Sequence, residues 1–73
     1  MTKKIGITCD DYKANKFRKG LLKAGFTLEY DGESGVNQVH LFRVEVQEKD
    51  FKQMQEKIGK TIRRLDLEFK HSN

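Results

Sequence analysis

The spacing of the apolar residues switches between two periods along this chain of 73 residues, and this switching constrains the fold more than any other feature. Ile5, Ile7 and Cys9 alternate with polar residues or glycine, which is the two-residue period of a half-buried strand. The spacing then changes to the three or four residues of an amphipathic helix, with a stripe formed by Ala14, Phe17, Leu21 and Ala24. Gly25 suits the position after a helix because glycine readily adopts a positive φ. The sequence therefore predicts a strand followed by a helix.

The middle of the chain returns to the two-residue period. Phe26, Leu28 and Tyr30 predict a second strand, and the residues that follow, DGESG at 31–35, are typical of a turn. A longer third strand is expected from about residue 36 to 46, with Phe42 on its core face, so that strands two and three form a hairpin. The open face of the sheet would then consist of Thr8, Thr27, Glu29, Val39, Leu41, Arg43 and Glu45. Since this face would carry no aromatic residue, base stacking of the kind used by RRM domains is not expected.

The last segment has helical spacing from about residue 48 onward. Its apolar stripe consists of Phe51, Met54, Ile58, Ile62, Leu65 and Phe69. Residues 65–70 also alternate strictly, as an edge strand would, and Gly59 could end a shorter helix. A long helix is favoured because no turn residues separate Ile62 from Leu65.

The expected order is βαββα, or βαββαβ if the tail is a strand. Both orders place two helices on one face of an antiparallel sheet. This is a two-layer α+β sandwich, either ferredoxin-like or truncated ferredoxin-like. We expect a single domain over residues 1–73, with a frayed tail at about 71–73.

The composition narrows the class of protein. No apolar stretch approaches the roughly 18 residues of a membrane span, and the N-terminus lacks the apolar region of a signal peptide. One cysteine cannot form an intramolecular disulfide or a cysteine-pair metal site. We therefore expect a cytoplasmic protein with no membrane association, no metal and no cofactor.

Charge is distributed unevenly. Residues 1–24 contain seven basic residues (Lys or Arg) and two acidic residues. Residues 25–48 contain one basic and five acidic residues, and residues 49–73 contain seven basic and four acidic residues. If both helices pack on one side of the sheet, their cations could merge into one positive surface. The candidate binding residues are Lys13, Lys16, Arg18, Lys19, Lys23, Lys60, Arg63 and Arg64. Such a surface attracts nucleic-acid phosphates, or an acidic protein surface, in a salt-dependent way. The leading hypothesis is a small binding protein without enzymatic activity.

Four other residues invite a chemical role. Cys9 is followed by Asp-Asp-Tyr and lacks the second cysteine of a metal-binding loop, so it is interpreted as a semi-buried residue at a strand end. Asp10 and Asp11 are interpreted as helix-capping residues. His40 would share a strand face with Phe42, but a catalytic histidine needs an orienting carboxylate or a nucleophile that the sequence does not identify. No catalytic residue is assigned.

The segment Leu21–Gly35, LLKAGFTLEYDGESG, contains a basic helix that ends in a Gly-Phe step, then a strand and a glycine-containing turn. This layout resembles the HicA-type ribonuclease toxins. Those toxins place a catalytic histidine directly after the turn, in a Gly-Ser-His motif, whereas Ser34 is followed here by Gly35 and the first histidine is His40. The catalytic residue therefore does not carry over from the resemblance.

Two alternative functions belong to other classes. One is a small ribonuclease or toxin-like enzyme that uses His40. The other is a self-associating structural module, such as a homodimer, that pairs through its sheet and brings the acidic hairpin of one copy to the basic helices of another.

Overall fold

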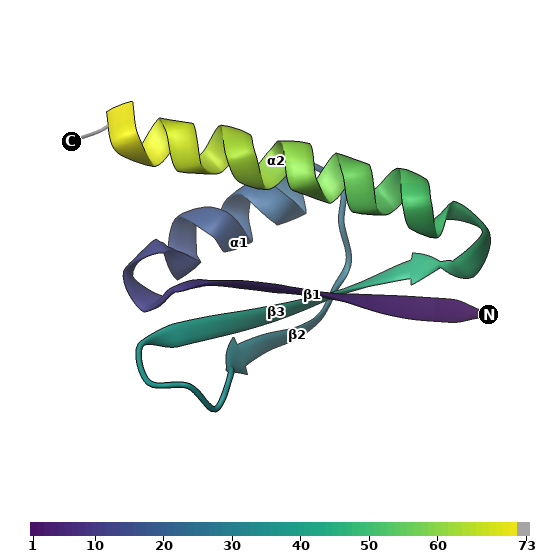
Figure 1. The fold of residues 1–73 in the computed structure, drawn as a ribbon, viewed down its shortest axis with the longest axis horizontal. Helices are drawn as coiled ribbons and strands as arrows, with labels where there is room; N and C mark the ends of the chain where they lie inside the picture. The colour runs from purple at the N-terminus through teal and green to yellow at the C-terminus, as the bar shows by residue number, and fades with distance from the viewer. Residues whose placement is uncertain (72–73) are drawn as a thin grey trace.

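The computed structural model of the protein describes residues 1–71. Along the chain it contains β1 (Thr2–Asp10), α1 (Ala14–Lys23), β2 (Leu28–Glu33), β3 (Val39–Gln47) and α2 (Phe51–His71) (Figure 1). A single 3₁₀ turn precedes each helix, at Asp11–Lys13 and at Glu48–Asp50. Two of the three residues expected to fray, 72 and 73, lie outside the described residues.

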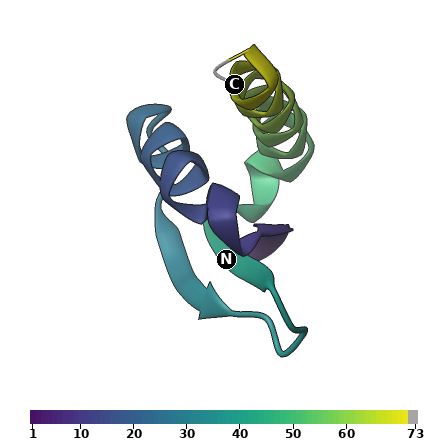
Figure 2. The same cartoon turned by 90° about the vertical axis from the view of Figure 1, so that its left-hand side faces the viewer.

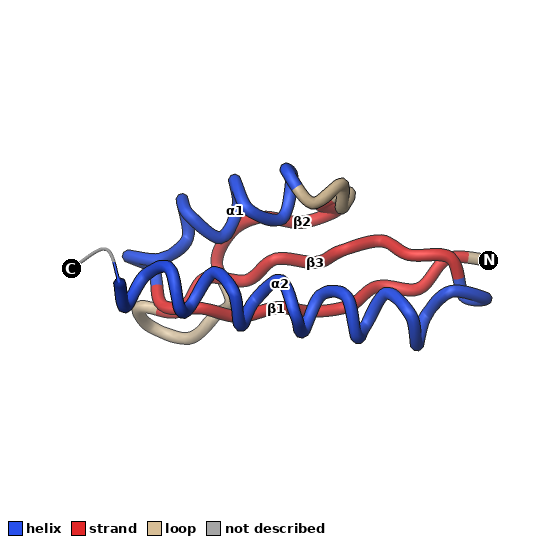
Figure 3. The backbone as a smooth tube through the Cα atoms, turned by 90° about the horizontal axis from the view of Figure 1, so that it is seen from above, coloured by secondary structure: helices blue, strands red, loops and turns tan. Residues whose placement is uncertain are grey.

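The elements form two layers. β3 lies between β1 and β2 and pairs with both in antiparallel fashion, which gives a three-stranded antiparallel sheet. Both helices lie on the same face of this sheet (Figure 2). Seen from above, α1 lies on the β2 side and α2 lies over β1 (Figure 3). Within residues 1–71, neither helix combines the length and the apolar character needed to cross a bilayer.

The core lies between the helices and the sheet. Its buried members are Ile7, Ala14, Phe17, Leu21, Phe26, Phe42, Val44, Val46, Ile58 and Leu65. From residue 42 to 47 of β3 the pattern is strictly alternating, with Phe42, Val44 and Val46 buried and the intervening residues exposed. The predicted core faces of the first and third strands are therefore confirmed.

The end of α1 is fixed by its last residues. Gly25 has a φ of 92°, and its backbone N–H donates to the carbonyl of Leu22 at 3.0 Å, while Phe26 N–H donates to the carbonyl of Leu21 at 3.1 Å. This pair of bonds is the Schellman arrangement, in which glycine takes the left-handed position. Leu21 and Phe26 are both buried, so the same turn that ends the helix also sends the chain into the core.

The second strand differs from its prediction. Leu28 pairs with Val44 but Tyr30 pairs with Arg43, so Glu29 is an extra residue and forms a bulge. The bulge turns Tyr30 to the open face and Asp31 to the helix face, so the expectation that Tyr30 shares the face of Leu28 was wrong. The expectation that no aromatic residue lies on the open face was also wrong, because Tyr30 lies there beside Arg43.

The hairpin loop also lies later in the chain than expected. β2 continues through Gly32 to Glu33, so the loop occupies residues 34–38 and β3 begins at Val39 instead of near residue 36. Gly35 and Gln38 have positive φ values of 89° and 64° in this loop.

α2 remains a helix through residues 65–70, which confirms the long helix in preference to an edge strand. Leu67, the residue that does not fit the helical stripe, is 55% exposed. Leu65 is 3% exposed and packs against α1 at Gly20. A Cβ atom at Gly20 would lie 2.5 Å from Leu65 Cδ2, so this glycine permits the close approach of the two helices.

Gly20 and Gly59 give a matched pair of substitutions. Overpacking a core costs about 1–3 kcal/mol, whereas replacing glycine by alanine inside a helix gains about 1 kcal/mol. We expect Gly20→Ala to lower the free energy of unfolding by about 1 kcal/mol, measured by urea denaturation. At Gly59 the nearest atom to an added Cβ is Arg63 Nη2 at 3.9 Å, so Gly59→Ala should be stabilising. Stabilisation by both substitutions would contradict the packing described.

Candidate functional site

A hollow between α1 and α2 is lined mainly by cations. We call it the basic groove, and its lining residues are Lys16, Lys19, Gly20, Lys23, Ala24, Arg64, Leu65 and Glu68. The lysines recur at spacings of three and four along α1, which places them on one side of the helix. Its volume is about 500 Å³. Because Gly20 has no side chain, the helices approach there and bring Arg64 toward the lysines of α1.

Most of the charge in the basic groove is unpaired. Lys16 Nζ lies 3.8 Å from Glu68 Oε2, and these side chains are 37% and 50% exposed. Exposed ion pairs of this kind contribute little to stability. Among the described residues, Lys19, Lys23 and Arg64 have no acidic group within 4.0 Å. The groove therefore has a positive potential.

The basic groove extends along α2. Lys60 lies one turn before Arg64 and thus on the same side of the helix. Lys57, which was not in the predicted set, lies one turn earlier, with its Nζ 5.3 Å from the centroid of the Phe26 ring. Arg63 is displaced around the helix, and its Nε donates to the carbonyl of Gly59 at 3.3 Å.

Two predicted binding residues are engaged elsewhere. Lys13 Nζ lies 3.4 Å from Asp66 Oδ1 and 5.8 Å from the Phe69 ring centroid. Arg18 points to the opposite flank of α1, where Nε and Nη2 both contact the carboxylate of Asp31, the latter at 2.9 Å. The structure therefore brings Lys16, Lys19, Lys23 and Arg64 together, with Lys60 one turn away, whereas Lys13 and Arg18 do not line the groove.

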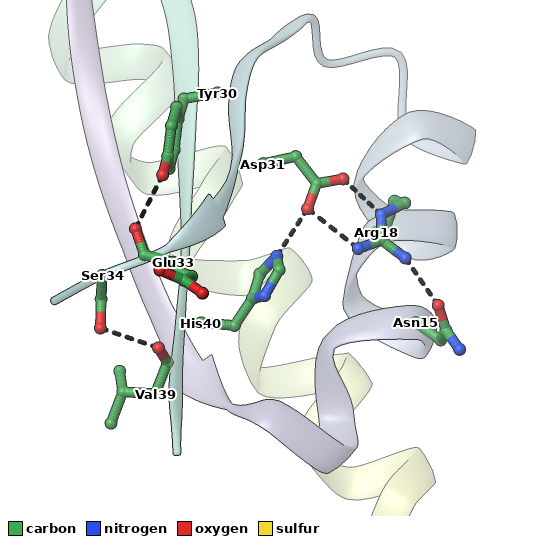
Figure 4. A network of polar contacts seen from close by, with 8 residues as sticks. All are labelled: Asn15, Arg18, Tyr30, Asp31, Glu33, Ser34, Val39 and His40. Carbon is green, nitrogen blue, oxygen red and sulfur yellow. Dashed lines mark hydrogen bonds and ion pairs between the residues drawn. The ribbon is translucent and has the colours of Figure 1, made fainter. Parts of the chain in front are cut away.

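Asp31 is the centre of a second cluster, formed with Arg18 and His40 (Figure 4). His40 Nε2 lies 2.5 Å from Asp31 Oδ1, and Arg18 Nη1 donates to Asn15 Oδ1 at 2.6 Å. The hydrogen bonds from Arg18 lower the pKa of Asp31 to about 2, and the contact with His40 acts in the same direction. Asp31 therefore remains ionised through the neutral range.

The sequence did not predict this cluster. Asp31 was assigned to a turn, and only the bulge at Glu29 directs it toward α1. With Nε2 held by Asp31, Nδ1 is the His40 nitrogen that remains for another proton donor or acceptor. The His40 side chain is 16% exposed and borders a hollow that also includes Asp11 and Glu33.

The cysteine and the paired aspartates have no reactive geometry. Burial, together with the charges of Asp10 and Asp11, raises the pKa of Cys9 to about 11, so its thiol is protonated at neutral pH. Asp10 occupies the position before the 3₁₀ turn without a side-chain capping bond, so the capping predicted for it is not found. Among the side chains that the structure describes, no group of three or more His, Cys, Asp or Glu is placed to hold a metal ion.

The open face carries a contact that the sequence also did not reveal. The Arg43 guanidinium carbon lies 5.1 Å from the centroid of the Tyr30 ring. The Tyr30 hydroxyl donates to the carbonyl of Glu33 at 2.8 Å and covers Gly32. This places one aromatic ring beside one cation on the uncovered side of the sheet.

Comparison of the chain with protein-family models, with curated proteins and with solved structures finds no match. Function is therefore inferred from the basic groove and from the Asp31 cluster.

The Asp31 cluster makes stability depend on pH in the acidic range. The pKa of Asp31 is lower in the folded protein than its ordinary value of 3.8, so the unfolded chain binds the proton more readily. The stabilisation is complete above about pH 4 and is lost as the pH falls through about 2. In Asp31→Asn, the free energy of unfolding measured between pH 2 and pH 5 should depend less on pH.

Glu33→Gln is the control for this measurement. Glu33 lies on the same strand, and its carboxylate has no ion pair among the described residues. Its replacement should leave the pH dependence close to that of the unmodified protein. Equal slopes for Asp31→Asn and the unmodified protein would show that Arg18 and His40 do not stabilise the Asp31 carboxylate.

Proposed function

We propose that the protein is a small binding protein without enzymatic activity whose basic groove contacts the phosphates of nucleic acid. The observation that carries the proposal is the gathering of Lys19, Lys23 and Arg64 in one concavity without acidic partners. Cations in such a setting exchange their counterions for backbone phosphates, and the released ions favour binding. Lys16 and Lys60 extend the contact surface and Arg63 lies at its margin, whereas Lys13 and Arg18 are paired with Asp66 and Asp31 and do not line the groove.

The lining of the groove favours phosphate over a protein surface. Stable protein interfaces are usually centred on aromatic or other large apolar anchors. The apolar members of the groove are Ala24 and Leu65, and Leu65 is already buried between the helices. An acidic protein partner is the alternative ligand for the same cations. Binding of nucleic acid is consistent with the cytoplasmic location expected from the composition.

We also infer that the fold is a truncated ferredoxin-like one. The support is that β3 lies between β1 and β2, antiparallel to both, with one helix after β1 and another after β3. This is the split βαβ arrangement followed by a second helix. A fold carries no function by itself, so the functional proposal depends on the groove alone.

Double substitution of Lys19 and Lys23 by glutamine tests the groove. For a short duplex, the slope of log affinity against log salt should become less steep by about 1.8, because each lost phosphate contact contributes about 0.9. Affinity should fall at low salt in a gel-retardation or fluorescence-anisotropy titration. Arg64→Gln should act in the same direction with about half the change in slope.

The control removes the same charge elsewhere. Lys49 and Lys52 are exposed and do not line the groove, so the double glutamine variant at these positions should bind almost as the unmodified protein does. Equal weakening by both double variants would show a diffuse charge effect without a site. No binding of duplex or single-stranded nucleic acid at about 50 mM salt, where such contacts are strong, would overturn the proposal.

The second candidate is a small ribonuclease or toxin-like enzyme that uses His40. The observation in its favour is the 2.5 Å contact between His40 Nε2 and Asp31 Oδ1. A carboxylate in this position orients an imidazole and fixes its tautomer, which a general acid or base requires. Nδ1 would then exchange the proton with a substrate at the adjacent hollow.

Cleavage of RNA distinguishes this candidate from simple binding. His40→Ala should abolish cleavage, and His71→Ala, which removes the other histidine of the chain, should leave it unchanged. Asp31→Asn should lower the rate and alter its pH profile, because the imidazole loses its orienting carboxylate. Cleavage that persists in His40→Ala would leave this candidate without its catalytic residue.

Self-association through the open face is the weakest of the three expected functions. The main apolar side chains there are Val39 and Leu41, and both are already half-buried.

A further inference from the structure

The outer edge of β1 is long and regular. β1 has nine residues, pairs with β3 without a shift in register, and lies at the end of the strand order. At the ends of this pairing, Asp11 N–H donates to Gln38 O and Glu48 N–H donates to Met1 O, each at 3.0 Å. Odd-numbered residues of β1 therefore bond to β3. The even-numbered residues, Thr2, Lys4, Gly6, Thr8 and Asp10, direct their backbone N–H and C=O groups away from the sheet.

The other edge of the sheet is protected and β1 is not. β2 has six residues and is bent by the bulge at Glu29, a device that discourages strand addition. At the β1 edge, Ile5 and Cys9 are only partly buried on the helix face. A hollow of about 290 Å³ adjoins Cys9 and is bordered by Phe17 and Ile62. An added strand could therefore cover apolar side chains and also form hydrogen bonds with the free backbone groups of β1.

A second complete copy does not fit this edge. Paired strands lie about 4.8 Å apart, whereas packed helices need about 8–10 Å between their axes. α2 lies over β1 (Figure 3), so two copies joined through β1 would bring their α2 helices too close. The occupant must be a strand that carries no covering helix of its own.

Charge at the two ends of β1 selects the direction of that strand. Lys3 and Lys4 lie at one end, and Asp10 and Asp11 lie at the other. An antiparallel strand with basic residues near its N-terminus and acidic residues near its C-terminus would place each charge opposite its complement. The residues of the added strand that lie opposite Ile5 and Cys9 would face the space beneath α2. We therefore expect these residues of the added strand to be apolar.

We propose that the β1 edge binds an extended peptide in antiparallel orientation, with a basic N-terminal end, an acidic C-terminal end and apolar residues at alternate positions. The peptide adds a fourth strand to the sheet, in the mode called β-augmentation. Its backbone bonds to the even-numbered residues of β1, and its apolar side chains cover Ile5 and Cys9. This site is separate from the basic groove and does not depend on it.

The probe is a synthetic peptide with the sequence of β1 itself, TKKIGITCD, kept reduced. Aligned antiparallel, it places its Asp opposite Lys4 and its second lysine opposite Asp10, with isoleucine opposite Cys9. In hydrogen exchange followed by NMR, the amides of Lys4, Gly6 and Thr8 should exchange rapidly in the free protein. They should become protected as the peptide is added up to about 1 mM.

A peptide of identical composition is the control. In TKDIGITCK the second lysine and the aspartate are exchanged, so aspartate would face Asp10 and lysine would face Lys4, and its affinity should be lower by about tenfold. Asp10→Lys in the protein should reduce this preference for TKKIGITCD, and it removes no capping bond because Asp10 makes none. Thr8→Pro should abolish binding, because it removes an outward N–H while leaving the bonds to β3 intact.

Three results would overturn the proposal. The first is unchanged exchange at Lys4, Gly6 and Thr8 in the presence of about 1 mM peptide. The second is equal affinity for the two peptides. The third is unchanged binding by a folded Thr8→Pro variant. Loss of the basic groove, in the double variant of Lys19 and Lys23, should leave peptide binding intact.

Discussion

The contact between Gly20 and Leu65 determines how the two helices share one face of the sheet. An added Cβ at Gly20 would lie 2.5 Å from Leu65 Cδ2, so the helices can approach only because that atom is missing. Leu65 is 3% exposed and Leu21 is fully buried beside this contact. Close packing of the helices in turn places the lysines of α1 next to Arg64 of α2. The basic groove is therefore a consequence of an apolar contact, and its charges are not what holds the helices together.

The bulge at Glu29 determines which side chains of β2 reach each face of the sheet. Because strand side chains alternate, one extra residue sends every later side chain of β2 to the opposite face. Asp31 reaches Arg18 and His40 on the helix face, and Tyr30 reaches Arg43 on the open face. The pairing of Arg18 with Asp31 also ties α1 to β2, while Lys13 and Asp66 tie the start of α1 to α2. Polar contacts thus bracket α1 on both flanks of the apolar core.

The proposed binding surfaces use different physical forces and lie in different layers. The basic groove lies in the helical layer and uses unpaired cations, whose effect is reduced by salt. The β1 edge lies in the sheet layer and offers unpaired backbone groups, which form hydrogen bonds at any salt concentration. The charges at the two ends of β1 determine which peptide sequence binds there. Each surface can therefore be altered without altering the other.

The sequence by itself determined the types of most elements, because a period of two residues is typical of a strand and a period of three to four residues is typical of a helix. It predicted the core faces of β1 and β3, the end of α1 at Gly25 and the continuation of α2 through residues 65–70. The set of cations was also visible in the sequence. Only the tertiary structure decided which of them meet, because the distance between residues 19 and 64 depends on the packing of helices far apart in the chain.

The bulge was equally invisible to sequence. A bulge is a mismatch in the pairing of two strands, so it cannot be predicted from the sequence of either strand alone. The partners of Asp31, the position of Tyr30 and the free edge of β1 all follow from pairing, which only the folded chain defines.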